Sequence, residues 1–218
     1  MKADNKLQYL VIELAHHLPY SVFGVTAALI LIGFFSFVAT ILGKPHIEPE
    51  AYEDLFHVFH PAHVLLSSVT STAIFWKNEK TWWKALVVGI LGSLVICTLS
   101  DILIPYVGGL LLGVKMDLHV CVIDTPSIVI PFAVTGMVAG LVIAESIESS
   151  TAYTHAAHIF VSSAASIVYL VSFGLHDWVH QIGWVFMITV AAVMIPCCAS
   201  DIAFPILWIK HPTCIHKH

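Results

Sequence analysis

Two short phrases, each present twice, contain the residues of this sequence that are best suited to metal or proton chemistry. A His-x-x-His phrase stands at positions 60–63 and again at 155–158, and a Cys-x-x-Ser-Asp phrase stands at 97–101 and again at 197–201. Histidines three residues apart share one face of a helix, so both rings of a pair can face the same ligand. Each half of the chain therefore carries nitrogen, oxygen and sulfur donors in the same order.

These donor types predict a site for a divalent transition metal. Imidazole nitrogens suit zinc, iron, cobalt and nickel ions, a carboxylate from a facing helix completes such a set, and thiolates favour softer ions. An ionisable side chain inside an apolar span costs on the order of 3 kcal/mol, so it indicates function by default. The expected metal ligands are His57, His60, His63, Asp101, His155, His158 and Asp201.

Other polar residues lie in or beside these phrases, or just before the fourth apolar run, and form a secondary set of candidates. They are Cys97, Ser100, Cys197, Ser200, Ser67, Ser162, His119 and Asp124. A structural interpretation competes with the functional one. A histidine pair at a helix entrance can simply hydrogen-bond to its neighbours, and a Ser-Asp pair near a helix end can cap the next segment. The recurrence of both phrases favours a functional site.

The composition indicates an integral membrane protein. Of the 218 residues, 58% are hydrophobic and 11% are charged, and the mean hydropathy is +0.90. Soluble domains have about a quarter of their residues charged. The expected partner is therefore the lipid bilayer. The chain has no arginine and its nine lysines are scattered, so no basic surface for a nucleic acid is expected.

The apolar runs predict an all-α polytopic membrane protein with six transmembrane helices, because about 20 apolar residues cross the hydrocarbon core. The expected spans are 20–42, 55–76, 85–104, 126–144, 154–175 and 183–209. Residues 106–118 are expected to form a loop or a re-entrant segment. Four parts follow in order: an interfacial segment at 1–17 that ends at a proline, a three-helix repeat at 18–113, a second at 114–209, and a histidine-rich tail at 210–218.

An odd number of spans per repeat makes the second copy enter the membrane from the opposite side, as in the inverted repeats of secondary transporters. One side of the membrane then carries most of the lysines, at positions 2, 6, 77, 80, 84, 210 and 217. The positive-inside rule predicts that both termini are cytoplasmic. In this arrangement the ligands of the first copy lie toward the outer face and those of the second copy toward the inner face.

The sequence thus predicts a transporter or channel for a divalent cation of zinc, iron, cobalt, nickel or manganese, with protons as a coupling ion. A transporter of another small solute could use the same groups as proton carriers. An intramembrane zinc hydrolase is an alternative, but neither His-Glu-x-x-His nor Gly-x-Ser-x-Gly is present. A haem-binding electron carrier is a further alternative. A transporter is favoured over an enzyme, and assembly into a homo-oligomer is left open.

Overall fold

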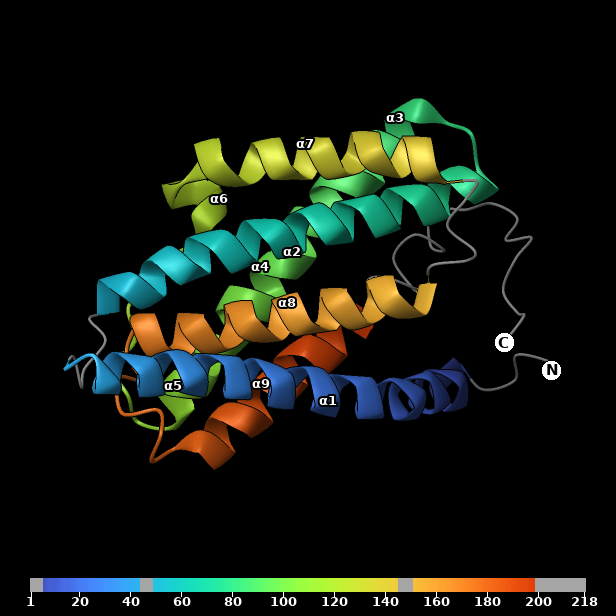
Figure 1. The fold of residues 1–218 in the computed structure, drawn as a ribbon. Coiled ribbons are helices and arrows are strands. Elements are labelled where there is room, and N and C mark those ends of the chain that lie inside the picture. The colour runs from blue at the N-terminus through green and yellow to red at the C-terminus, as the bar shows by residue number, and fades with distance from the viewer. Residues whose placement is uncertain (1–5, 44–48, 145–150, 199–218) are drawn as a thin grey trace.

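Helices account for all the regular secondary structure in the part of the chain that the structure describes. The computed structural model describes residues 6–43, 49–144 and 151–198 (Figure 1). Four helices are long and apolar enough to cross a bilayer, at His17–Ile41, Pro49–Asn78, Trp82–Leu111 and Pro126–Ile143. Two shorter apolar helices, Ala156–Ser172 and Ile182–Met194, follow. The all-α class is confirmed, and the four long helices are compatible with an integral membrane protein.

The first helix, α1 (Lys6–Ile41), continues through Pro19. The sequence predicted a separate interfacial helix that ends at this proline, and that break is wrong. A proline inside a helix removes one hydrogen bond to the preceding turn. Ending the helix beside an apolar span would leave several backbone groups without partners in hydrocarbon. Continuation of the helix is therefore the less costly arrangement.

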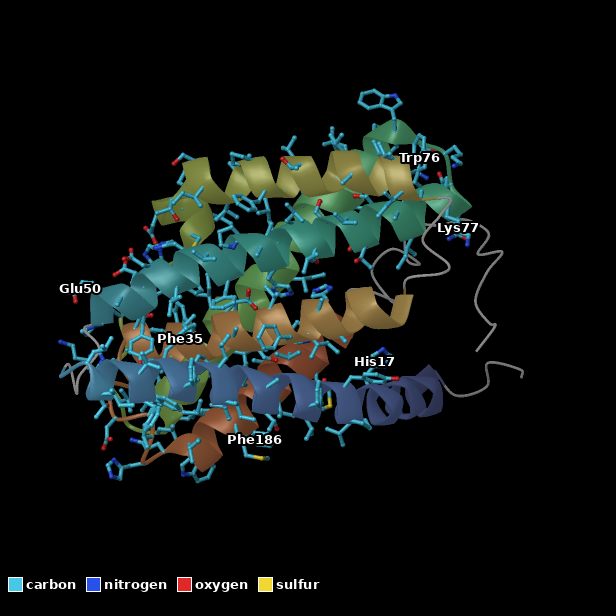
Figure 2. The ribbon with its side chains drawn as sticks, viewed as in Figure 1. His17, Phe35, Glu50, Trp76, Lys77 and Phe186 are labelled. Atoms are coloured by element: carbon cyan, nitrogen blue, oxygen red, sulfur yellow. The ribbon has the colours of Figure 1, made fainter. Side chains whose placement is uncertain are left out.

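The second helix, α2 (Pro49–Asn78), begins earlier than the predicted start at residue 55. Proline suits the first turn of a helix, and the acidic side chains that follow it interact favourably with the positive end of the helix dipole. Figure 2 shows Glu50 at one end of this helix and Lys77 at the other. His63 lies midway, roughly 20 Å from each at 1.5 Å per residue.

A third helical rod extends from Trp82 to Leu111 and contains two π-helical segments. Its parts are α3 (Trp82–Leu86), η1 (Val87–Gly92), α4 (Ser93–Thr98), η2 (Leu99–Leu103) and α5 (Ile104–Leu111). The sequence predicted that this helix ends at residue 104 and that a loop or re-entrant segment follows, but the helix continues through two glycines. A Cβ atom on Gly108 would lie 2.6 Å from the Ile188 side chain. Close packing against the last helix therefore explains why position 108 is glycine.

The remaining helices are α6 (Cys121–Asp124), α7 (Pro126–Ile143), α8 (Thr151–Ser172) and α9 (Ile182–Cys198). The bounds of α7 agree with the predicted span at 126–144. Helix α8 begins three residues before the predicted span, and α9 begins one residue before it. The end of the predicted sixth span, beyond residue 198, lies outside the described residues.

Helix α2 lies at the centre of the fold, between α7 on one side and α8 on the other, and α8 also packs on α1 (Figure 1). Small residues allow the close approaches. Gly136 of α7 faces the carbonyl oxygen of Leu65, and a Cβ atom on Gly140 would lie 2.6 Å from that of Val69. Such small-residue contacts are typical of helices that pack within membranes.

Large apolar side chains cover the outside of this bundle, whereas many polar side chains lie inside it. The exposed group includes Phe23, Ile30, Phe37, Val95, Leu111 and Val142, and the buried polar group includes His60, His63, Asp101, His158 and several serines. A protein in water would be expected to show the reverse distribution. Hydrocarbon around the helices accounts for both observations.

Candidate functional site

The carboxylate of Asp101 is the centre of a buried polar cluster between the helices. Its Oδ2 atom accepts hydrogen bonds from the Nδ1 atoms of His60, at 2.9 Å, and of His63, at 2.7 Å. All three side chains are fully buried. A carboxylate only accepts hydrogen bonds, so each ring must carry its proton on Nδ1. The two histidines of the first phrase therefore converge on the aspartate of the second phrase.

The π-helical segment η2 positions this carboxylate. Asp101 lies within η2, and Pro105 follows it by four residues. A proline has no N–H to donate to the carbonyl four residues earlier, and its ring crowds that carbonyl. Single π-helical turns accommodate such a mismatch and occur often at functional sites. Pro105, four residues beyond the Cys-x-x-Ser-Asp phrase, thus accounts for the local irregularity that presents Asp101 to α2.

Serine hydroxyl groups satisfy the second oxygen of the carboxylate. Oδ1 of Asp101 accepts hydrogen bonds from the hydroxyl groups of Ser100, at 2.7 Å, and of Ser162, at 3.1 Å. Ser166 donates to the backbone carbonyl of Ser100 at 3.2 Å. These contacts join α8 to η2. The carboxylate accepts four hydrogen bonds in all, which is the condition for holding such a group in an apolar interior.

His63 also contacts the histidine phrase of the second half. Its Nε2 atom lies 2.7 Å from Nε2 of His158 on α8, and the two ring centroids are 4.6 Å apart. The sequence placed these residues near opposite faces of the membrane, and that separation is wrong for this pair. Because α2 begins at Pro49, His60 and His63 lie toward the middle of the helix rather than at its entrance.

A continuous chain of hydrogen bonds results, from His60 through Asp101 and His63 to His158. The far nitrogen of His60, Nε2, is buried and has no hydrogen-bond partner among the described residues. A buried nitrogen of this kind requires an explanation, and a bound ion or water is the usual one. The ring of Phe56 stacks on His60 at a centroid distance of 5.2 Å and closes that side of the cluster.

The other predicted site residues have different placements. His155 lies in α8 and Cys197 in α9, but their side chains are not among those that the structure describes. Ser200 and Asp201 lie outside the described residues. Cys97 is buried one turn before Asp101. Ser67 is buried as well, but its hydroxyl group has no hydrogen-bond partner within the described part of the chain. It contrasts with Ser162, which holds the equivalent position in the second phrase.

A second group of ligand-type residues lies near the start of α2. Nε2 of His57 is 3.2 Å from Nε2 of His119, and the carboxylate of Asp124 lies 3.4 Å from Nδ1 of His119. Cys121 is buried beside them. The ligand atoms of His57, His119 and Cys121 all lie within 4.8 Å of one another. Sequence reasoning left Cys121 out of the candidate ligands, although its spacing from His119 was a usable signal.

Burial raises the pKa of the Cys121 thiol to about 12. Without a metal the sulfur therefore holds its proton at neutral pH, and a metal that binds there must displace it. The backbone N–H of Val120 donates to Asp124 at 2.7 Å, which fixes the carboxylate opposite the His119 ring. A carboxylate beside a histidine ring is a common second contact in metal sites.

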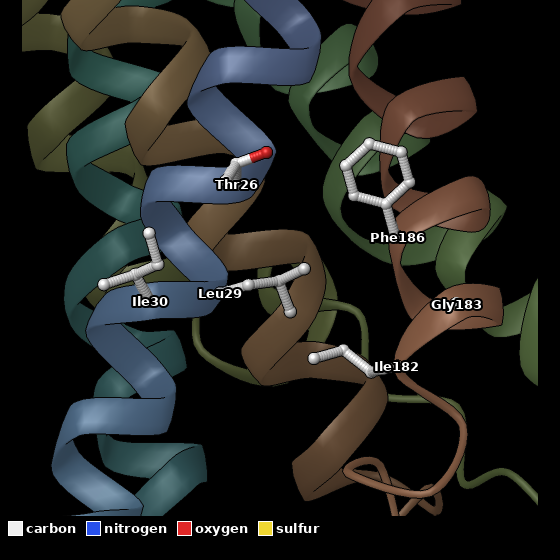
Figure 3. Close-up of a pocket in the computed structure, with 6 residues that line it drawn as sticks. All are labelled: Thr26, Leu29, Ile30, Ile182, Gly183 and Phe186. Carbon is white, nitrogen blue, oxygen red and sulfur yellow. The ribbon is translucent and has the colours of Figure 1, made fainter.

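One surface pocket lies away from both polar groups. It is a groove of about 490 Å³ between α1 and α9, lined by Thr26, Leu29, Ile30, Ile182, Gly183 and Phe186 (Figure 3). Its lining is almost wholly apolar, and it offers no acid, base or ligand group. A groove of this kind on the outside of a membrane bundle suits a lipid chain rather than chemistry.

Comparison of the chain with protein-family models, with curated proteins and with solved structures gives no significant match.

Proposed function

We propose that the protein carries a divalent transition-metal cation across the membrane by way of the buried cluster around Asp101. The observation that carries the proposal is the pair of hydrogen bonds from His60 and His63 to Oδ2 of Asp101. Both hydrogen bonds use the Nδ1–H group, so the Nε2 atom of each ring keeps a lone pair that can bind a metal ion. Histidines that ligate metals are held in this way, with the other ring nitrogen bound to a carboxylate.

The ion is proposed to bind between His63 and His158. Their Nε2 atoms are 2.7 Å apart, and a tetrahedral metal with bonds of about 2.0 Å would hold two such nitrogens roughly 3.3 Å apart. The pair needs to open by less than about 1 Å to accept an ion. His60 offers a further nitrogen on the other side of Asp101. Two strong ligands rather than four suit an ion that must leave again.

The location of the cluster also supports transport. Helix α2 exceeds the length needed to cross the hydrocarbon core, and His63 lies at its middle. An intramembrane ionisable group at that depth indicates an ion or proton pathway by default. Surface adsorption of a metal would not require these residues to be buried.

Six spans in two inverted repeats, with both termini in the cytoplasm, form part of the proposal. The helix contacts support it. Gly24 of α1 packs on Ile159 of α8, and Gly136 of α7 packs on Leu65 of α2. Ile159 and Leu65 follow the two copies of the histidine phrase, one residue apart in register. The His63–His158 contact then lies between the two halves, where transporters of this design bind their substrates.

Flux measurements in proteoliposomes test the proposal. The wild-type protein is expected to transport Zn²⁺ or Co²⁺, and His63→Ala and Asp101→Asn are expected to abolish transport because they remove a ligand and its orienting carboxylate. His180→Ala is the matched control, since its ring is 82% exposed and distant from the cluster. If His63→Ala and Asp101→Asn transport metal at the wild-type rate, the proposal is wrong.

A second candidate function uses the same residues for protons alone. The unbroken hydrogen-bond chain from His60 to His158 favours it, because neighbouring imidazoles and a carboxylate can pass a proton between them. The protein would then couple proton flow to transport of another solute. Proton flux that depends on His63 but is indifferent to Zn²⁺ and Co²⁺ would support this function over metal transport.

A further inference from the structure

A group of residues outside the central cluster has the composition of a metal site in its own right. It consists of His57 on α2 and of His119 and Cys121 on the segment that joins α5 to α7. Its ligand atoms all lie within 4.8 Å of one another. This is the single grouping of at least three such ligand atoms found among the described residues. We propose that these three side chains form a metal-capture site that delivers the ion to the central cluster.

The spacing of the two imidazole nitrogens suits binding to one ion. The two Nε2 atoms point at each other across 3.2 Å, close to the separation of neighbouring ligands around a tetrahedral ion with bonds of about 2.0 Å. Asp124 faces the other nitrogen of His119 at 3.4 Å. The ring of Phe173 stacks on His119 at 5.1 Å with an interplanar angle of 6°, so this ligand is held in one orientation.

The position of the group suits an ion that arrives from water. His57 and His119 are partly exposed, whereas Cys121 is buried. Asp124 is 44% exposed, so a negative charge stands at the approach to the site. A metal ion would therefore meet a carboxylate first, then two imidazoles, and finally a thiol in the interior.

The site also lies next to the central cluster. His57 and His60 are one helical turn apart on α2, a rise of about 4.5 Å. The ring of Phe56 lies against both, at centroid distances of 5.7 Å from His57 and 5.2 Å from His60. Movement of this one ring would connect the two sites. The role as a donor to the central cluster rests on the proposed function, whereas metal binding by the three residues does not.

The donor set narrows the class of ion. Two imidazoles and a thiolate suit zinc, cobalt, nickel and copper, whereas manganese, magnesium and calcium prefer oxygen ligands. Manganese, which the sequence alone left among the candidates, is therefore disfavoured by this site. The cargo of the protein is then a borderline or soft transition-metal ion.

Cobalt spectroscopy tests the capture site directly, because a thiolate bound to Co²⁺ gives an intense charge-transfer band. The protein would be prepared in detergent with Cys97, Cys197, Cys198 and Cys214 replaced by serine, so that Cys121 is its one cysteine. Addition of Co²⁺ is expected to produce the band, Zn²⁺ to displace it, and Mn²⁺ to leave it unchanged. A further Cys121→Ser substitution is expected to abolish it. Absence of the band in the protein whose one cysteine is Cys121, or persistence of the band after Cys121→Ser, would overturn the proposal.

Two histidine variants and one aspartate variant complete the test. His57→Ala and His119→Ala are expected to weaken Co²⁺ binding, and Asp124→Asn is expected to weaken it by about 10- to 100-fold while the band persists. His180→Ala is the control and is expected to bind as the parent does. If the four-serine chain does not fold, Cys121→Ser in the otherwise wild-type chain is expected to lower the band intensity, and an unchanged band would refute the site.

The outcome for this site is separable from that for the proposed function. His63→Ala, which removes the central pair, is expected to stop transport but to retain the cobalt–thiolate band. Cys121→Ser is expected to lose the band. A band that depends on Cys121 in a protein whose flux ignores His63 would support the capture site and refute the transport pathway.

Discussion

The Nε2 atoms of His63 and His158 lie 2.7 Å apart, although the two residues are separated by 95 positions in the sequence. They belong to the two copies of one phrase, so the halves of the chain meet at equivalent residues. Asp101 holds the far side of the His63 ring through Nδ1. The central cluster therefore takes residues from both halves of the chain.

A double-mutant cycle on this pair is expected to show strong coupling. His63→Ala and His158→Ala should each abolish Zn²⁺ binding at the central cluster, and the double variant should lose little more, because residues in direct contact act as a unit. Calorimetric titration of the purified proteins measures the effect, with Cys121→Ser as a common background that removes the capture site. Additive losses from the two substitutions would show that the rings do not share an ion.

Asp101→Asn is expected to destabilise the protein as well as to inactivate it. An asparagine has one acceptor oxygen and an NH₂ group that confronts the donor on a neighbouring histidine. Breaking a buried charged network by removing one partner typically costs about 3–5 kcal/mol. The midpoint of thermal unfolding in detergent should fall clearly for this variant. Asp177→Asn, on an exposed loop side chain, is the matched control, and an equal fall in both variants would contradict the central role of Asp101.

Much of the fold was predictable from the periodicity and length of the apolar runs. Helix α7 was predicted almost to the residue, because Pro126 opens an apolar run that a polar segment closes. The starts and ends of α2 and α5 were less predictable. The acidic residues before residue 55 were interpreted as part of a loop, yet they stabilise the first turns of α2. Gly108 and Gly109 were also interpreted as part of a loop, although both lie in α5, where Gly108 packs against Ile188.

The central cluster was predictable in its members but not in its arrangement. The recurrence of the phrases identified His60, His63, Asp101 and His158. The depth of a residue in the membrane follows from where its helix begins, and the start of α2 was predicted too late. His63 and His158 were therefore assigned to different depths. The role of Phe56 and the approach of His119 and Cys121 to His57 depend on how the segment after α5 folds back on α2, and no local pattern encodes that contact.

Residues in the loop between α8 and α9 offer a test of local electrostatics. The hydrogen bond from His180 to Asp177, at 2.6 Å, raises the pKa of the His180 imidazole above its usual value. The charged form is thus favoured in the folded protein, and this contribution to stability is present at low pH and is lost as the pH rises through the raised pKa. NMR titration is expected to show a pKa above about 6.5 for His180. Asp177→Asn should return it toward that value, and an unchanged pKa would show that the contact does not form.

Close packing between α2 and α7 is expected to make Gly136 intolerant of any side chain. A Cβ atom there would collide with the backbone carbonyl of Leu65 and approach the Cβ atom of Ser68 to 2.9 Å. Backbone atoms cannot move aside as a flexible side chain can, and overpacking of this kind typically costs about 1–3 kcal/mol. Gly136→Ala should therefore lower the unfolding midpoint. Gly183→Ala is the control, because nothing lies within 4 Å of a Cβ atom at that position.

Displacement of α2 by the new methyl group would also shift the His63–His158 pair, so Gly136→Ala should reduce Zn²⁺ flux whereas Gly183→Ala should not. A variant that keeps both stability and flux would show that the helices are not in contact at Gly136.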